Sequence, residues 1–381
     1  MVPADPDATR DSEVVPPMTD VPVDTEPVSR SRGANLNLWL NLILVALIIC
    51  IIGVAAYFGY SVYRNRQTDL STTAAGRLAD VLEAQVRKNP NDAVLRVRLG
   101  EALGGMGKYT EATAQLNAAL KIDPKHVGAF VDLGLVAMSA NNLSAAESYF
   151  KKVVELTDSS QYSAVNQSRE VALYNLGMIA LEQKRNEDAA GFFKAALAIR
   201  KDSSDTYYQL GKALQAMGEI EGAIQQLEIG VQFDPGFAEA HYFLGQLYKE
   251  NKDDVNASYQ FAKAAELSPD ADPPREALEA YGPAAKWVEK ARASYTAGNQ
   301  AEALTFILIA RNLDAKSIDA VKLHAEILVK DNKLKDALDV FRQAATLDPQ
   351  NAEVQAQIAA LEPQVAALQK QEAAKNAKSK K

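Results

Sequence analysis

The chain has 381 residues, 49 acidic and 41 basic side chains, a formal net charge of −8 and one cysteine, Cys50. A single cysteine excludes a disulfide framework and a cysteine metal cluster. The acidic balance argues against a general nucleic-acid-binding face, which needs clustered basic side chains.

Residues 1–35 are predicted to form a disordered, acidic, proline-rich tail. They hold six prolines and seven acidic side chains but no aromatic residue and no apolar period. Such a segment cannot bury enough apolar surface to offset the entropy lost on folding. A short stem at residues 64–73, with no pattern of its own, is expected to separate the next element from the rest of the chain.

Residues 36–63 are predicted to form a transmembrane helix in contact with the lipid bilayer. The run from Leu42 to Tyr60 contains no charged side chain, and as a helix it would span about 28 Å, close to the hydrocarbon thickness of a bilayer. Trp39 lies before it, and Tyr57 and Tyr63 lie near its other end, where membrane interfaces favour aromatic rings. The alternatives are a buried core helix, which would rarely be apolar on every face, and a cleaved signal, which normally lies nearer the N-terminus.

From residue 74 the apolar residues recur at helical spacing, and one pattern repeats along the chain. Leu-Gly recurs at a constant interval, apart from one longer interval between Gly134 and Gly177, and an alanine and then a large apolar residue follow each glycine at fixed offsets. The glycines are Gly100, Gly134, Gly177, Gly211 and Gly245, the alanines are Ala112, Ala146, Ala189, Ala223 and Ala257, and the large residues are Leu116, Phe150, Phe193, Leu227 and Phe261. Small residues at these offsets let two helices cross closely, and Pro124, Pro235 and Pro269 would stop the second helix of their units.

This pattern resembles the tetratricopeptide repeat, a helix-turn-helix unit of about 34 residues. The resemblance covers roughly residues 74–350 and implies an all-α superhelical solenoid preceded by the single N-terminal transmembrane helix. We expect a half-unit and five repeats over residues 74–267, and a proline-rich break at 268–283 that is either a hinge or a rigid kink. Two further units and a capping helix are expected over 284–362, then a lysine-rich tail at 363–381, which is either solvated or in contact with anionic lipid or nucleic acid.

The resemblance implies a concave groove, lined mainly by the first helix of each unit, that binds a peptide segment or a helix of a protein partner. Tyr174, Tyr208 and Tyr242 occupy the same repeat position in three consecutive units. They are predicted to form a partner-binding ladder, with packing inside the groove wall as the alternative. Their predicted neighbours in the groove are Lys212, Gln215, Gln246 and Lys249. Some family members clamp a terminal carboxylate with Lys and Asn at positions that here read Val97 and Glu101, so that clamp is not expected.

Nothing in the sequence indicates an enzyme, a cofactor or a metal site. The three histidines, His126, His241 and His324, are far apart and have no partner at metal-ligand spacing. There is no glycine-rich phosphate loop and no nucleophile elbow. We therefore expect no catalytic, cofactor-binding or metal-binding residues and no nucleic-acid partner.

The expected function is that of a single-pass membrane scaffold which binds proteins through its groove. Membrane-anchored bacterial proteins of this type often help to assemble envelope complexes, so the resemblance implies a similar role. Arginines flank the apolar run equally, Arg30 and Arg32 on one side and Arg64 and Arg66 on the other, so the positive-inside rule does not decide the orientation. The near-absence of cysteine favours an extracytoplasmic solenoid. The alternatives are a cytosol-facing receptor or adaptor and a non-catalytic recognition subunit of an enzyme complex.

Overall fold

The computed structural model describes residues 73–158 and 167–379, and every regular element in these ranges is an α-helix. The described helices belong to one compact unit, residues 74–381. Residues 1–72 lie outside the described residues. They include the predicted acidic tail, the predicted transmembrane helix and all but the last residue of the predicted stem. Within the described ranges, no helix combines the length and apolarity that crossing a bilayer requires.

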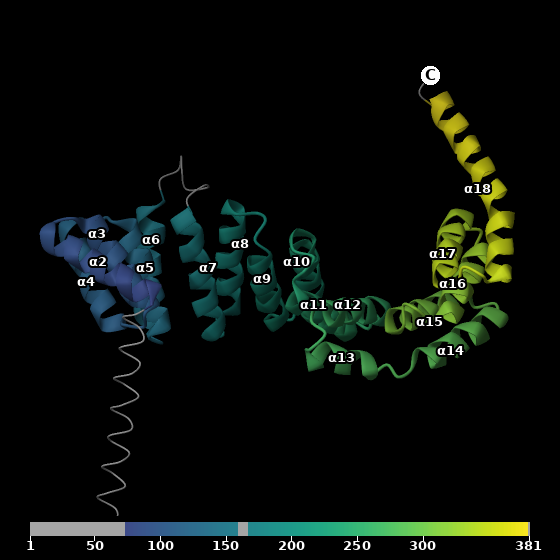
Figure 1. Cartoon of the computed structure of the whole chain (residues 1–381), viewed down its shortest axis with the longest axis horizontal. Helices are drawn as coiled ribbons and strands as arrows, with labels where there is room; N and C mark the ends of the chain where they lie inside the picture. The colour runs from purple at the N-terminus through teal and green to yellow at the C-terminus, as the bar shows by residue number, and fades with distance from the viewer. Residues whose placement is uncertain (1–72, 159–166, 380–381) are drawn as a thin grey trace, which may run out of the picture. The chain divides into compact units, whose positions relative to one another are not determined.

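The helices follow one another in chain order and pack in pairs (Figure 1). The first are α2 (Ala74–Lys88), α3 (Ala93–Gly105), α4 (Tyr109–Ile122), α5 (Val127–Ser139), α6 (Leu143–Leu156), α7 (Gln167–Glu182), α8 (Asn186–Ile199), α9 (Ser204–Ala216) and α10 (Ile220–Phe233). The rest are α11 (Ala238–Glu250), α12 (Asp254–Leu267), α13 (Asp272–Glu279), α14 (Ala284–Thr296), α15 (Gln300–Leu313), α16 (Ile318–Lys330), α17 (Leu334–Leu347) and α18 (Ala352–Ser379). The expectation of an all-α fold is confirmed for the described residues.

Local sequence signals begin and end these helices. Asp92 and Asn142 accept hydrogen bonds from backbone N–H groups three residues later, which caps α3 and α6. At the other end, α4, α10 and α12 each stop two residues before Pro124, Pro235 or Pro269, as expected because proline disfavours the helical region for its predecessor.

The two helices of a repeat cross closely because a glycine of the first meets a large side chain of the second. A Cβ added to Gly134 would lie 2.5 Å from Phe150, and one added to Gly177 would lie 2.6 Å from Phe193. Both rings are fully buried. Phe150 also belongs to an apolar cluster that includes Leu176 and Ile179 of the next repeat. The same ring thus fills the gap inside its own pair and stabilises the stacking of neighbours.

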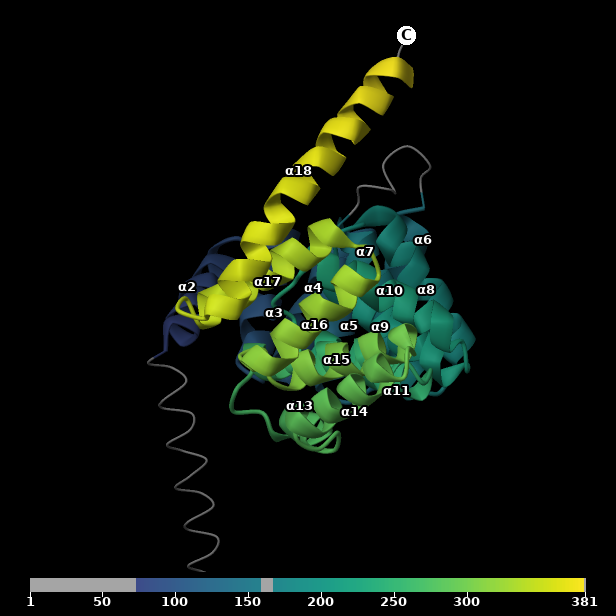
Figure 2. The same cartoon turned by 90° about the vertical axis from the view of Figure 1, so that its right-hand side faces the viewer.

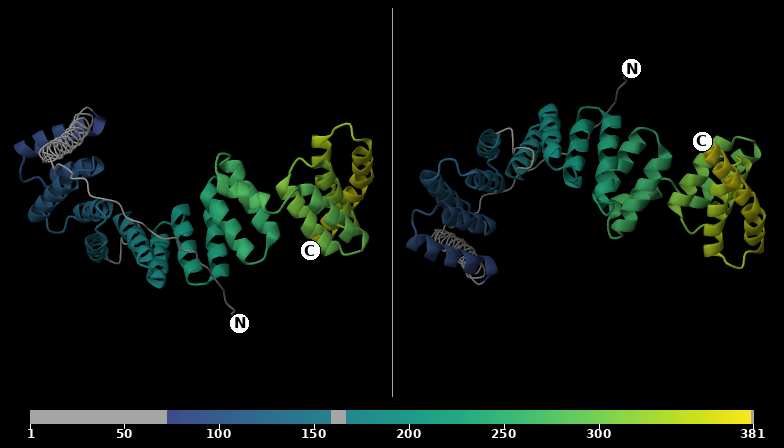
Figure 3. Two further views of the ribbon diagram at one scale, coloured as in Figure 1. Left: turned by 90° about the horizontal axis from the view of Figure 1, so that it is seen from below. Right: turned by 90° about the horizontal axis from the view of Figure 1, so that it is seen from above.

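Successive pairs stack through the second helix of one and the first helix of the next, as in α4 with α5 and α8 with α9. Figure 3 shows the pairs following one another in chain order. This order changes at residues 268–283. Instead of α14, it is α15 that packs directly on α12, and Asn312 of α15 donates from Nδ2 to the Val255 carbonyl oxygen (3.1 Å) and to Ser258 Oγ (3.0 Å). The proline-rich segment itself contains α13, with proline in its first turn, a position that helices tolerate.

The last helix, α18, is longer than expected. Figure 2 shows it continuing beyond its contact with α17. The expected boundary between a capping helix and a tail at residues 362–363 lies inside it, at Pro363. Val354, Leu361 and Val365 are buried against α16 and α17, whereas the side chains of residues 366–376 are exposed. The Ala-, Gln-, Glu- and Lys-rich sequence after Pro363 consists of strong helix formers, which explains why the helix continues without burial.

Candidate protein-binding groove

The first helices of four consecutive repeats, together with the turn after α7, line a groove of about 770 Å³. We call it the central groove. Its residues come from α5, α7, α9 and α11, with one from the start of α8. They are Met138, Met178, Leu181, Glu182, Lys184, Asn186, Tyr208, Gln209, Lys212, Gln215, Ala216, Phe243 and Gln246. A volume of this size suits a ligand of several side chains.

Tyr208 lies in the wall of the central groove. Its ring packs against Phe237 (centroids 5.2 Å apart) and edge-on against Phe243 (5.6 Å), and Lys212 Nζ lies 5.6 Å from its centroid. Burial, assisted by the charge of Glu239, raises the pKa of its hydroxyl. The aromatic neighbours pack on the ring while part of it stays accessible, which suits a rigid contact surface.

The polar side chains of the groove differ in whether they have hydrogen-bond partners. Gln215 donates to Glu250 Oε2 (3.3 Å) and Asn186 to the Ala216 carbonyl oxygen (3.4 Å). Gln209 Oε1 is buried but accepts no hydrogen bond from any described group. A buried acceptor in this condition is unusual in a native structure and needs an explanation.

The structure brings four of the seven predicted groove residues together: Tyr208, Lys212, Gln215 and Gln246 all line the central groove. Tyr174 and Tyr242 are half-buried and do not line it; their rings pack on Phe193 (5.8 Å) and Phe261 (5.7 Å) of their own repeats. Tyr174 still contacts a groove residue: the side-chain amide N–H of Gln209 donates to its hydroxyl oxygen, which opposes the rise in the Tyr174 pKa that burial and the charge of Asp205 cause.

Lys249 faces a different environment. Its ammonium pairs with Asp254 Oδ1 (2.5 Å) and lies 4.4 Å from the centroid of Tyr281. Asp254 opens α12 and Tyr281 follows α13. Lys249 therefore contacts residues of the junction between α12 and α14 and does not line the central groove.

Sequence reasoning missed the apolar part of the groove. Met138, Met178 and Leu181 occupy the same repeat positions in α5 and α7 as Lys212 and Gln215 in α9. A comparison of Lys212 and Gln215 with the equivalent positions of the two preceding repeats would have found them. Gln209 and Phe243 follow the predicted tyrosines Tyr208 and Tyr242 by one residue, and only the packing reveals that they face the groove.

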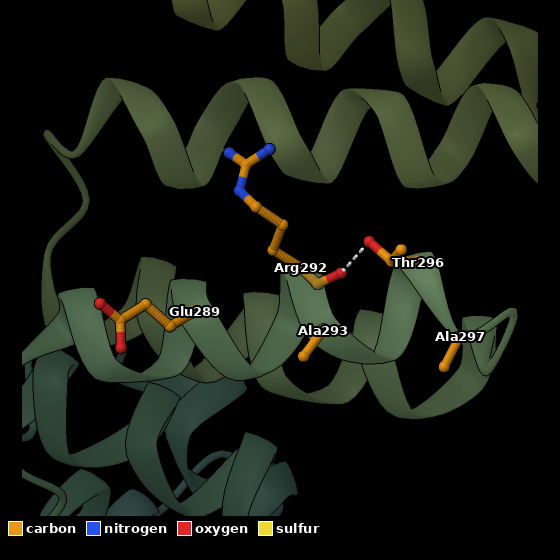
Figure 4. Close-up of a pocket in the computed structure, with 5 residues that line it drawn as sticks. All are labelled: Glu289, Arg292, Ala293, Thr296 and Ala297. Atoms are coloured by element: carbon orange, nitrogen blue, oxygen red, sulfur yellow. Dashed lines mark hydrogen bonds between the residues drawn. The ribbon is translucent and has the colours of Figure 1, made fainter.

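Two smaller cavities lie on other first helices. One, of about 270 Å³ between α3 and α5, contains Glu101 and Asp132, and burial followed by the charge of Glu101 raises the pKa of Asp132 to about 6. The other, of about 580 Å³, lies on α14 and is bordered by Glu289, Arg292, Ala293, Thr296 and Ala297. In Figure 4 the Arg292 side chain extends toward a neighbouring helix, and the Thr296 hydroxyl donates back to the Arg292 carbonyl oxygen (2.8 Å).

The histidines have structural partners. His126 Nδ1 accepts from the Ala129 N–H and caps α5, His241 contacts Gln260 Oε1 (2.6 Å), and His324 contacts Arg311. Burial and the charges of Arg311 and Lys333 lower the pKa of His324 to about 4. Among the residues that the structure describes, no three His, Cys, Asp or Glu side chains cluster closely enough to hold a metal ion.

Paired helices stacked in register, with a groove along the first helices, define a helical-repeat protein of the kind that binds other proteins. Two models of the tetratricopeptide repeat match the chain, at residues 97–163 and 180–247. These matches support the assignment of the repeats to the tetratricopeptide repeat family, and with it a role as a protein-interaction scaffold.

Curated relatives share the repeats over part of their length. Cellulose synthase operon protein C of Xanthomonas axonopodis pv. citri is 31% identical over 216 residues, which are 54% of this chain and 13% of the relative. Anaphase-promoting complex subunit 3 of Schizosaccharomyces pombe is 23% identical over 143 residues, which are 38% of this chain and 20% of the relative. The chain thus spans about a fifth or less of the length of these two relatives.

Among solved structures, YrrB, described as a tetratricopeptide protein with an unusual peptide-binding site, is 20% identical with a TM-score of 0.44; the match covers 53% of this chain and 99% of that one. The structure of PilF of Pseudomonas aeruginosa is 19% identical with a TM-score of 0.41, over 61% of this chain and 97% of that one.

Proposed function

We propose that this protein is a non-enzymatic, membrane-anchored scaffold that binds a protein partner in the central groove and helps to assemble or organise an envelope complex. The observation that carries the binding role is the groove itself, because four consecutive first helices contribute apolar, amide and basic side chains to one continuous surface. Such surfaces accept an extended segment or a helix of a partner.

The membrane anchor is proposed on the uncharged run Leu42–Tyr60. Anchoring would raise the concentration of the scaffold near partners in the same bilayer, and this increases apparent affinity without a new contact. In this proposal the solenoid is extracytoplasmic and residues 36–63 cross the bilayer once.

A site-specific crosslinking experiment tests the binding role. A photo-crosslinking residue is placed at Gln246 in the groove, and in a matched chain at Lys194, an exposed residue of α8 that does not line the groove. We expect crosslinks to a defined partner from position 246 only. Replacing Tyr208 by alanine in the same chain should weaken the crosslink, since loss of an aromatic contact costs about 1 kcal/mol or more. Equal crosslinking from both positions would reject the groove as the binding surface.

Membrane extraction and protease access test the anchor and its orientation. We expect the full chain to stay in the membrane pellet after an alkaline carbonate wash, and a chain lacking residues 36–63 to be released. In sealed inverted vesicles the solenoid should resist protease until the vesicles are lysed. Release of the full chain by carbonate would reject the anchor, and cleavage in sealed inverted vesicles would place the solenoid on the cytosolic side.

A further inference from the structure

The central groove surrounds a buried oxygen that has no donor. Gln209 lines the groove, but its Oε1 is buried and accepts no hydrogen bond among the described residues, so a ligand reaches this oxygen only when the side-chain amide turns toward the groove. A buried acceptor without a donor destabilises the free protein, and a ligand that supplies the donor recovers that loss on binding. The backbone N–H of an extended segment is such a donor, because an extended chain leaves its N–H groups unpaired.

The side chains around Gln209 indicate what that segment carries. Met178 and Leu181 of α7 and Phe243 of α11 provide apolar contacts, and methionine adapts to side chains of different shape. Lys212 lies on α9, between these two helices in chain order; its side chain is exposed and has no ion-pair partner within the described ranges. Lys184 at the same groove is also exposed and unpaired there, while Glu182 contributes one opposing charge.

Lysine next to an aromatic face is suited to a carboxylate ligand. Lys212 Nζ lies 5.6 Å from the Tyr208 centroid, so a cation–π attraction favours an ammonium position next to this groove residue. A charge-assisted hydrogen bond from this ammonium to a carboxylate is stronger than a neutral one. In an extended segment, side chains two residues apart lie on the same side, so one segment can place an apolar and an acidic side chain together in the groove.

We propose that the central groove selects an extended segment of a protein partner in which an internal Asp or Glu, bound by Lys212, stands near an apolar residue bound by Met178, Leu181 and Phe243. The segment's backbone donates to Gln209 Oε1 after this side chain has turned toward the groove. This inference rests on the proposed function, because it names the chemistry of the partner that the scaffold binds.

Three peptide libraries test the proposal on the immobilised full chain. Each peptide has nine residues and blocked ends, with Asp, Asn or Lys fixed at the centre and only uncharged residues elsewhere. We expect retention of the Asp library to exceed that of the Lys library about tenfold, with the Asn library between them, since a charge-assisted bond contributes about that factor. A fourth library, with central Asn and a free C-terminus, separates an internal carboxylate from a terminal one and should behave like the blocked Asn library.

Two groove variants and one control assign the preference to its residues. Lys212→Glu should reverse the order of the Asp and Lys libraries, whereas Lys194→Glu on α8 should leave it unchanged. Gln209→Leu should lower the retention of every library by a similar factor without altering their order, because it removes the backbone acceptor but not the charge.

The outcomes also separate this inference from the proposed function. Equal retention of the three blocked libraries, or an order that Lys212→Glu does not change, overturns the inference. If no library is retained while position 246 still crosslinks a partner, the groove binds something other than an extended acidic segment and the inference is again wrong. If crosslinking at position 246 also fails, the proposed function fails with it.

Discussion

At the residue scale, the close helix crossings depend on glycine, because its lack of a side chain leaves room for a large side chain of the facing helix. Gly134 lies under the fully buried ring of Phe150, which packs on neighbours in two repeats. Gly134→Ala should therefore lower the free energy of unfolding by about 1–3 kcal/mol, the usual effect of overpacking, even though alanine is the better helix former. Urea unfolding followed by helical circular dichroism measures this change.

Gly191 in α8 provides the matched control. A Cβ there would meet no atom within 4 Å. Gly191→Ala should therefore raise the free energy of unfolding by about 0.5–1 kcal/mol through helix propensity alone. If both substitutions shifted stability in the same direction, the glycines at the crossings would not be needed for packing.

Asp132 gives a second prediction at this scale, from its raised pKa. Its pKa is about 6 in the folded chain against an ordinary value of 3.8, because of burial and then the charge of Glu101. Across this window the folded chain holds a proton that the unfolded chain has released, so the Asp132 contribution to stability falls as pH rises. Asp132→Asn should therefore stabilise the protein at pH 7.5 by about 1 kcal/mol, after allowance for solvent screening.

The same measurement at low pH checks the sign of this effect. At pH 3.5 both states bind the proton, so Asp132→Asn should change stability very little. Asp202→Asn, at an exposed position before α9, serves as the control and should be neutral at both pH values. Stabilisation by Asp132→Asn of equal size at pH 3.5 and pH 7.5 would show that a packing change, and not the charge, is responsible.

At the scale of the helices, the repeat pattern in the sequence predicts the features that depend only on contacts inside one repeat. The Leu-Gly spacing predicts the helix pairs, and the proline positions predict where the second helices stop, because both follow from contacts inside one unit. The groove position of Tyr208, Lys212, Gln215 and Gln246 is predicted for the same reason.

Features that depend on contacts outside the repeat could not be predicted in this way. The α12–α15 contact includes Asn312, which donates to two acceptors that belong to a different repeat, at Val255 and Ser258. Lys249 leaves the groove because Tyr281 and Asp254 meet at the same junction, where the Tyr281 hydroxyl donates to Asp254 Oδ1 (3.0 Å). No repeat pattern contains these partners.

The junction leads to a prediction about Trp287. Its indole N–H donates to the Tyr281 carbonyl oxygen (2.8 Å), its ring packs on Phe306 (5.7 Å), and Lys290 Nζ lies 4.2 Å from its centroid. We expect these contacts to make the segment a rigid kink and not a hinge. Trp287→Ala should cost about 2 kcal/mol, less than for a fully buried ring because the side chain is half-buried, and should speed amide hydrogen exchange in α13 and α14.

Trp287→Phe is the control for the junction. It keeps a ring against Phe306 but loses the donor to Tyr281, so the expected cost is about 1 kcal/mol. If Trp287→Ala left exchange in α13 and α14 as slow as in the parent chain, the junction would not be fixed by this side chain.

At the scale of the whole described unit, each helix pair contacts mainly its neighbours. Stability is then close to a sum of local terms, and damage at one end should not spread far along the row. The five separate apolar clusters of the described residues agree with this, because the cluster that includes α18 contains only residues of α16, α17 and α18.

Two truncations of α18 test this locality. Ending the chain at Gln350 removes Val354, Leu361 and Val365 from the cluster, and each buried side chain contributes roughly 1.5–3 kcal/mol. Ending it at Gln369 removes only the part of the chain after Gln369, where the described side chains are exposed. Since the surface ion pairs lost with α18, Lys322–Glu353 and Arg342–Glu362, contribute little, the apolar contacts should decide the result.

Hydrogen exchange resolved by peptide distinguishes the outcomes. The chain ending at Gln350 should exchange much faster in α16 and α17 but at the parent rate in α3 to α12, whereas the chain ending at Gln369 should match the parent throughout. Faster exchange in α3 to α12 after the shorter truncation would show that the unit unfolds as one cooperative body, because only long-range coupling could carry the loss of α18 across the α12–α15 contact.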